Sequence, residues 1–320
     1  MAQAQKKPIR TEYIAMALLC VLIAIFVVIL IVVSSYKNAQ REESALSQSE
    51  SADESAVGDQ SGDEPSETSV EESRETVGTV QIASSGKTEG ILALTQKPAE
   101  NKVAETPTDL VNVSRNYNRK FGLSGTSLEL KKDAVDALNA MTAAFAETNG
   151  QTNIMADKCY VPYELLTDRE TQLDLTAGYS VLLSIYPRDP DGDTLGTGKY
   201  VWLQDNCTSY GYILRYPAEK KDLTGVEGSS RIYRYVGYAH AAYMGKYHLC
   251  LEEYLSQIKN ATMEQPIEFT YLNSSGEEKA CAVYYCPASA EDTSRVTVQE
   301  GANYSISGNG TDGFIVTVYK

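Results

Sequence analysis

The sequence reads Tyr210-Gly211-Tyr212-Ile213-Leu214-Arg215-Tyr216-Pro217, then Asp222-Leu223-Thr224-Gly225, and then Arg234-Tyr235-Val236-Gly237. The first of these segments is rich in tyrosine and branched aliphatic residues, which favours a strand over Tyr210 to Tyr216. Farther along, Leu249-Cys250-Leu251-Glu252-Glu253-Tyr254-Leu255 indicates a helix that stops before Pro266. This middle part of the chain is therefore expected to mix strands and helices.

Upstream of this stretch, the sequence predicts an amphipathic helix over roughly residues 128–148. It should end at Asn149-Gly150, a helix stop signal. The apolar residues that recur there at steps of three and four are Val135, Leu138, Met141 and Phe145. A further strand is expected from Ser180 to Tyr186, where apolar residues run almost without interruption.

After Pro266 the pattern changes to strands alone, separated by Asn-Ser-Ser-Gly and Gly-Asn-Gly turns. The predicted strands are Ile267–Leu272, Ala280–Cys286, Arg295–Val298 and Phe314–Tyr319. The fold class is therefore predicted to be α+β. Residues 91–265 should form a domain with a small antiparallel sheet and helices, and residues 266–320 a small all-β appendage.

The N-terminus carries an apolar run from Ile14 to Val33 without a charged residue. A run of about 20 residues matches the hydrocarbon thickness of a bilayer, whereas the apolar core of a cleaved signal peptide is usually about 7–15 residues long. Basic residues precede the run and an acidic tract follows it, so the N-terminus is expected in the cytoplasm. Residues 1–36 are predicted to be a cytoplasmic tip and transmembrane helix, a single-pass anchor that meets the membrane over residues 13–36 and leaves the C-terminal domain extracytoplasmic.

Residues 37–90 hold 13 acidic and 4 basic residues, 11 serines and no aromatic residue. Low hydrophobicity combined with like charge predicts a disordered linker, because such a segment cannot bury enough apolar surface to offset the entropy of ordering. The tract accounts for most of the net charge of −15. That balance argues against a nucleic-acid partner, because a phosphate-binding surface needs clustered Lys and Arg.

Five cysteines follow the predicted anchor, an odd number, so at least one thiol has no partner within the chain. Cys281 and Cys286 are five positions apart in a predicted strand, which places them on opposite faces and disfavours a disulfide between them. No C-x-x-C spacing occurs, so a structural zinc site made of these thiols has little support.

The quoted middle segments resemble the VanY-type D-alanyl-D-alanine carboxypeptidases, zinc peptidases of the hedgehog/D,D-peptidase fold. In that family YGFILRYP is followed by DITG, EPWHWRYVG and a helix ending in LEEYL, at the intervals found here. The likeness extends more weakly upstream to Asp109-Leu110-Val111, in the place of a DLV segment, and covers roughly residues 91–262. It implies a carboxypeptidase-like domain that acts on the peptidoglycan stem peptide.

Members of this family need three zinc ligands, a general base and an anchor for the substrate carboxylate. Two ligands come from a segment with the pattern S-x-H-x-x-G-x-A-x-D, and the third is the His of EPWHW. The Glu of EPWHW activates the metal-bound water, whose pKa the zinc lowers to about 7. An Arg in an SGYRS segment binds the terminal carboxylate as a bidentate pair.

None of these functional residues is matched in this chain. Where the family has EPWHW, this chain has Ser229 at the position of the base and Ile232 at the position of a zinc ligand. We align the His-to-Asp segment so that Gly178 takes the place of the His and Ile185 that of the Asp, while Cys159 falls at the carboxylate anchor. Because the flanking segments are retained, Gly178, Ile185, Ser229 and Ile232 are expected to converge into an apolar patch.

Side chains beside these positions are the candidates for a groove that binds substrate without a metal. They are Tyr179, Ser180, Arg231 and Tyr233. The two histidines of the chain, His240 and His248, are eight residues apart in the helix that follows the RYVG segment, about 12 Å along its axis. They could share a zinc ion only if that helix were broken.

The sequence therefore favours a pseudo-peptidase of the cell envelope, a degenerate family member with no predicted cofactor. It would bind the peptidoglycan stem peptide or another envelope protein without cleavage. One alternative is an active zinc D,D-carboxypeptidase that trims the terminal D-Ala of stem peptides with relocated ligands. Another is a structural cell-envelope protein. Whether the chain is an enzyme stays open, although the unmatched ligand and base positions argue against it.

Overall fold

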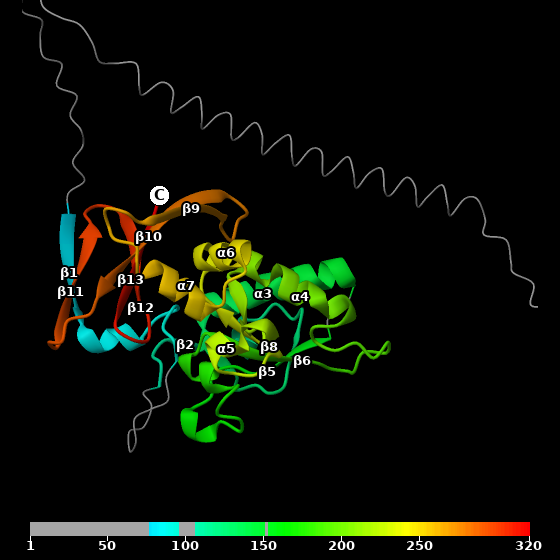
Figure 1. Ribbon diagram of the computed structural model, residues 1–320. Helices are drawn as coiled ribbons and strands as arrows, with labels where there is room; N and C mark the ends of the chain where they lie inside the picture. The colour runs from blue at the N-terminus through cyan, green and yellow to red at the C-terminus, as the bar shows by residue number, and fades with distance from the viewer. Residues whose placement is uncertain (1–76, 96–105, 151–152) are drawn as a thin grey trace, which may run out of the picture. The chain divides into compact units, whose positions relative to one another are not determined.

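The computed structural model describes residues 77–95, 106–150 and 153–320 (Figure 1). These residues fall within one compact unit that spans Glu72 to Lys320. The predicted membrane anchor and residues 37–76 of the predicted linker lie outside the described residues. Within the described ranges, no helix is long and apolar enough to cross a bilayer.

The described strands of the domain form a five-stranded sheet with the order β3-β5-β6-β8-β7. β3 and β5 are parallel, and the other neighbours are antiparallel. The strands are β3 (Gly122–Leu123), β5 (Ile154–Lys158), β6 (Ser180–Ile185), β7 (Tyr212–Tyr216) and β8 (Ser229–Tyr235). The predicted strands around residues 180–186 and 210–216 are thus present and the α+β class is confirmed, but the sheet is mixed rather than antiparallel as predicted, because β3 joins it in parallel.

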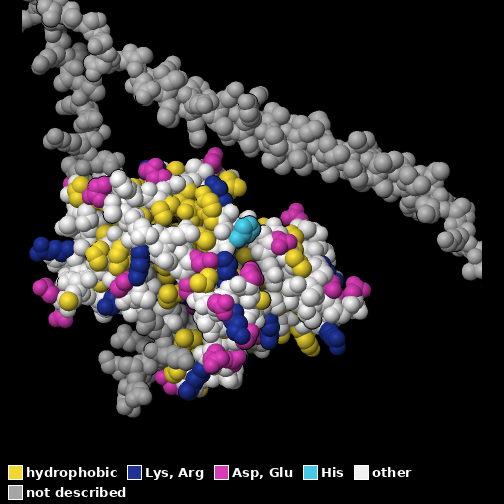
Figure 2. All heavy atoms as spheres, in the orientation of Figure 1, with side chains coloured by type: hydrophobic (Ala, Val, Ile, Leu, Met, Phe, Trp, Pro, Cys, Tyr) yellow, Lys and Arg dark blue, Asp and Glu magenta, His cyan; other side chains and the backbone are white. Residues whose placement is uncertain are grey.

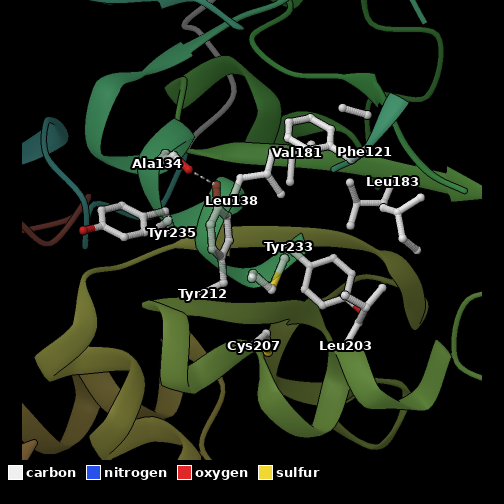
Figure 3. Close-up of a cluster of buried hydrophobic side chains, with 14 of the residues drawn as sticks. Phe121, Ala134, Leu138, Val181, Leu183, Leu203, Cys207, Tyr212, Tyr233 and Tyr235 are labelled. Carbon is white, nitrogen blue, oxygen red and sulfur yellow. Dashed lines mark hydrogen bonds between the residues drawn. The ribbon is translucent and has the colours of Figure 1, made fainter. Parts of the chain in front are cut away.

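One face of this sheet packs against the predicted amphipathic helix, α3 (Lys132–Asn149). Leu138 of the helix lies in one cluster with Val181 of β6 and Tyr233 of β8 (Figure 3). The helix ends at Gly150 with a φ of 64°, as the sequence predicts. It begins later than predicted because β4 (Glu129–Lys131) pairs with β2 (Leu110–Asn112) just before it.

Short helical segments complete the domain, among them η3, which covers the opposite face of the sheet. They are α2 (Val113–Asn116), η2 (Tyr163–Leu165), η3 (Leu173–Ala177), η4 (Gly198–Tyr200), α4 (Val201–Asn206), η5 (Cys207–Tyr210), η6 (Ala218–Lys220) and α5 (Lys221–Thr224). Because side chains alternate along a strand, Val181 and Leu183 face α3 whereas Leu182 faces η3.

The single helix expected after the RYVG segment is broken in two. α6 (Tyr238–Tyr247) ends at His248, whose φ of 53° is left-handed, and α7 (Leu251–Ile258) begins after Cys250. The Glu253 carboxylate accepts a hydrogen bond from the Cys250 backbone N–H and so caps the new helix. The apolar pattern does not predict the break, because apolar side chains of both helices pack in one core cluster.

Residues 266–320 fold as strands, as predicted, and pack on α6 and α7. A four-stranded antiparallel sheet has the order β12-β13-β10-β9. Its strands are β9 (Ile267–Leu272), β10 (Glu278–Pro287), β12 (Asn303–Gly308) and β13 (Gly313–Tyr319), whereas β11 (Thr293–Gln299) belongs to a separate two-stranded sheet. Hydrophobic side chains gather over β9 and α6 in Figure 2. The rings of Tyr243 of α6 and Phe269 of β9 lie 4.8 Å apart.

The last part of the predicted linker is ordered, so the boundary at residue 90 is wrong. β1 (Val77–Ala83) pairs with β11 along its whole length, and η1 (Ser84–Thr88) follows it. Val80 and Ile82 alternate with polar residues and pack against the core of the appendage. Acidic composition averaged over the whole tract concealed this short period-two pattern.

The five cysteines in the described residues are all free and buried. Cys281 packs in the cluster that joins β10 to α6 and α7, whereas Cys286 packs in the core of the appendage. The two thiols therefore sit in different cores, as expected for positions five apart in one strand.

Candidate functional site

The motifs quoted from the sequence meet in a buried ion network. Asp174 Oδ1 accepts hydrogen bonds from Arg215 Nε at 3.1 Å and from Arg234 Nη1 at 2.9 Å. These three residues are each less than 5% exposed. Arg215 also donates to both carboxylate oxygens of Glu252, at 2.7 and 3.2 Å, so the ILRYP segment of β7 is bound to the LEEYL segment of α7.

Arg234 extends the network to the N-terminal segment of the domain. Its Nη2 donates to the carbonyl oxygens of Ile91 and Ala93, each at 2.9 Å. Ser180 completes the shell around Asp174 by donating to Oδ2. Burial opposes the charge of the Asp174 carboxylate, but Arg234 and Arg215 outweigh it and lower its pKa from the ordinary 3.8 to about 2.

Next to Asp174 on η3, a compact apolar cluster occupies the opposite face of the sheet. Leu175 of η3, Leu182 of β6 and Ile232 of β8 pack together with Tyr216. Leu182 and Ile232 are directly paired across β6 and β8. All four side chains are between 0 and 7% exposed.

The expected convergence of Ile185 with Ile232 is not observed. Ile185 is paired with Ile154 of β5 and packs against the α3 side of the sheet. Three positions separate Ile185 from Leu182, which places their side chains on opposite faces of the strand. The alignment that put Ile185 at the Asp position is therefore wrong.

Gly178 fixes the correct alignment. It ends η3 with a φ of 74°, a left-handed conformation that favours glycine, and a Cβ at this position would lie 2.7 Å from Leu110 Cδ2. Gly178 therefore corresponds to the glycine of the H-x-x-G-x-A-x-D pattern rather than to its histidine. Counting from that glycine, Leu175 takes the His position and Leu182 the Asp position, and Ile232 stays at the third ligand position.

Comparisons with known proteins agree with this fold and with the motifs. The chain is 28% identical over 229 residues to a D-alanyl-D-alanine carboxypeptidase of Enterococcus faecium, covering 66% of this chain and 69% of that protein. It is 29% identical over 143 residues to a D-alanyl-D-alanine carboxypeptidase of Enterococcus faecalis, covering 40% of this chain and 53% of that protein.

A solved structure of the vancomycin resistance D,D-dipeptidase VanXYg, in complex with a D-Ala-D-Ala phosphinate analogue, has the same fold. It matches with a TM-score of 0.60 and 22% identity, covering 77% of this chain and all of that one. No protein-family model matches the chain. The chain is related to the VanY-type D-alanyl-D-alanine carboxypeptidases.

The residues at the ligand positions of the VanY-type pattern do not fit a zinc ion. Leucine and isoleucine side chains hold no lone pair, and zinc is bound in proteins by Cys, His, Asp and Glu. Burial of each such aliphatic side chain contributes about 1.5–3 kcal/mol to stability, so the cluster stabilises the fold where the family holds a metal. Over the described ranges, no group of three or more His, Cys, Asp or Glu side chains is placed to share a metal ion.

The positions of the VanY-type base and carboxylate anchor are also inert. Ser229 pairs with Tyr216 at the start of β8, and its Oγ accepts a 3.4 Å hydrogen bond from the Arg231 backbone N–H. Cys159 is fully buried, and burial raises the pKa of its thiol to about 12. A neutral, inaccessible thiol cannot pair with a substrate carboxylate.

The four groove candidates separate into two buried and two accessible residues. Ser180 and Tyr233 are fully buried, so neither lines a groove as expected. Tyr179 lines a cleft of about 410 Å³, and Arg231 lines a separate hollow of about 310 Å³. Arg231 Nη2 donates to the Asp157 carboxylate at 2.8 Å.

The two histidines do not come together as a zinc site, although the helix between them is broken. His240 is buried, with Nδ1 2.6 Å from the Tyr254 hydroxyl and Nε2 3.2 Å from Thr317 Oγ1. Burial lowers the pKa of His240 to about 4, so its ring is neutral at pH 7. His248 ends α6 in a left-handed conformation, which agrees with a helix-capping role.

The corrected alignment predicts which substitutions create metal affinity. We expect the triple variant Leu175→His, Leu182→Asp and Ile232→His to gain stability from zinc, because three ligands then meet at one place. At a zinc concentration about 100-fold above the Kd, the melting temperature should rise by about 5–10 °C. If the metal-free variant is unfolded, zinc should restore its far-UV circular dichroism.

The matched control is Leu175→His, Ile185→Asp and Ile232→His, which keeps Gly178 and carries its carboxylate on the other face of β6. It should show no such response to zinc. An equal response of the two triple variants, or a response of the control alone, would contradict the alignment.

The ion network predicts a stability loss on Asp174→Asn of about 3–5 kcal/mol, because two buried guanidinium groups lose their shared carboxylate. The folded pKa of Asp174 lies below its ordinary value, so its contribution is present above about pH 4 and is lost as the pH falls toward 2. Over that pH range, we expect the difference in unfolding free energy between wild type and variant to shrink by about 2 kcal/mol. Urea unfolding at several pH values measures both effects.

Asp136→Asn is the control for this prediction, because Asp136 forms an exposed ion pair with Lys132 on α3. Its unfolding free energy should change by less than about 0.5 kcal/mol at every pH. A loss on Asp174→Asn no larger than that of the control would show that the network is dispensable.

Proposed function

We propose that the chain is a non-hydrolytic relative of the D,D-carboxypeptidases that binds the peptidoglycan stem peptide outside the cell. One observation carries the proposal: Leu175, Leu182 and Ile232 fill the place at which the family pattern puts its zinc ligands. A domain that keeps the fold and replaces every ligand with an aliphatic residue retains a surface for the substrate but not the means to cleave it.

The activities named for the relatives support a peptide ending in D-Ala-D-Ala as the ligand. Two of them are D-alanyl-D-alanine carboxypeptidases, and the structure with the same fold holds a D-Ala-D-Ala phosphinate analogue. A stem peptide ends in a carboxylate, which guanidinium groups pair with well. Arg188 and Arg231 line the 310 Å³ hollow beside Ile185 together with Asp189 and Asp193, and these arginines are our candidates for that partner in place of Cys159.

The N-terminal sequence supports the proposed location at the cell membrane. An apolar run of bilayer length, basic residues before it and an acidic tract after it favour a single-pass anchor with a cytoplasmic N-terminus. The acidic tract up to residue 76 would then hold the folded unit away from the membrane. Such a tether suits a protein that reaches into the cell wall.

The test is a comparison of binding and turnover with a fluorescent stem pentapeptide ending in D-Ala-D-Ala. We expect the full chain to bind the peptide and to release no D-alanine with or without added zinc, while the Enterococcus faecium enzyme releases it under the same conditions. Arg231→Gln should weaken binding by about tenfold or more, because a charge-assisted hydrogen bond is lost. Arg295→Gln, on the exposed face of β11, should leave binding unchanged.

Two outcomes would contradict the proposal. Release of D-alanine that a chelator abolishes would favour an active enzyme with relocated ligands. Absence of stem-peptide binding by the wild type would favour a partner protein or a structural role in the envelope.

A further inference from the structure

A cleft of about 410 Å³ lies at the junction between the domain and the β appendage. The first turn of α6 forms one wall, and the ends of β9, β12 and β13 form the other. Tyrosines dominate its lining, and none of the three aliphatic residues at the zinc-ligand positions takes part. The cleft is therefore distinct from the site derived from the family motifs.

Tyrosine side chains line this cleft. The hydroxyls of Tyr179, Tyr235, Tyr238 and Tyr271 form no hydrogen bond with any residue that the structure describes. Tyr235 is only 8% exposed, and its hydroxyl is on the side away from the core cluster in Figure 3. These hydroxyls are open to the cleft, where a ligand can supply their hydrogen-bond partners in place of solvent.

The N-terminus of α6 adds backbone donors to the same wall. Gly237 precedes the helix and gives it no side-chain cap, and the residues of the first turn line the cleft. The first N–H groups of a helix have no intrahelical acceptor and carry a partial positive charge. They suit a carbonyl oxygen of a ligand.

The lining of the cleft offers few ion-pair partners, which favours a ligand of low charge. Asp133 carries the single formal charge among the lining residues at neutral pH, since His240 is neutral there. Its carboxylate is exposed and forms no ion pair with another described residue. The cleft therefore offers one acceptor, several hydroxyls, backbone donors and aromatic surface.

We propose that this cleft binds a neutral glycan of N-acetylated amino sugars. Sugar hydroxyls can donate to Asp133 and exchange hydrogen bonds with the tyrosine hydroxyls, and an acetamido carbonyl can accept from the start of α6. The apolar faces of the sugar rings match the tyrosine rings, which combine an apolar body with a polar end. The volume lies within the usual range for small-ligand sites, about 300–1,000 Å³. This site is independent of stem-peptide binding.

The test is isothermal titration of the full chain, in detergent, with the peptide-free tetramer of N-acetylglucosamine. We expect saturable binding by the wild type. Tyr235→Phe and Tyr238→Phe should each weaken it by about 2–10-fold and Asp133→Asn by about tenfold, because each removes hydrogen-bonding capacity while keeping the size of the side chain. The control Tyr247→Phe, on α6 but outside the cleft lining, should bind as the wild type does.

Circular dichroism and thermal melting verify that each variant is folded. Absence of binding by the folded wild type at millimolar tetramer would overturn the proposal, as would equal binding by all four variants. A stem pentapeptide without sugar serves as the second ligand. Its failure to bind would refute the proposed function and leave the glycan result unaffected.

Discussion

The architecture depends on the ion pairs that the buried carboxylate of Asp174 forms with two arginines. The carboxylate lies between the guanidinium groups of Arg215 and Arg234, which come from neighbouring strands of the central sheet. Through these two arginines it joins η3, β7, β8, the first helical turn of α7 and the backbone at residues 91–93. Removing one member would leave uncompensated charge in the core, so the fold needs all of these residues together.

This network accounts for the likeness of the motif segments without reference to a metal. The segments most similar to the VanY-type motifs supply Arg215, Arg234 and Glu252, whose roles here are structural. The ligand positions lie beside them on the same elements, and their side chains are aliphatic. Because aliphatic side chains pack well on the buried face of a sheet, replacing polar ligands with Leu and Ile keeps the backbone course while removing the metal chemistry.

Much of the fold could be predicted from the sequence because periodic patterns are local. The strands over residues 180–185 and 212–216, the end of α3 at Gly150 and most strands after Pro266 follow from apolar spacing and turn residues. β12 was missed because its sequence, Asn-Tyr-Ser-Ile-Ser-Gly, is mostly polar. β1 was missed because its partner, β11, lies more than 200 residues away in the sequence.

The site was predicted less well, because ligand positions depend on three-dimensional register. An alignment error of three residues placed Ile185 rather than Leu182 at the Asp position and so moved the side chain to the other face of β6. The glycine spacing within the motif was the signal that could have prevented the error, since Gly178 is the position that needs a left-handed φ. The tyrosine-lined cleft had no linear signature, because its walls come from segments far apart in the chain.

The central claim is that the buried cluster of Leu175, Leu182 and Ile232 leaves the chain without a zinc site. The most direct measurement is the zinc content of the full chain after purification from zinc-supplemented cells, determined by mass spectrometry of the metal. The account predicts far less than one zinc ion per chain, at the level of a buffer blank. One zinc ion per chain, removable by a chelator with a loss of thermal stability, would contradict it.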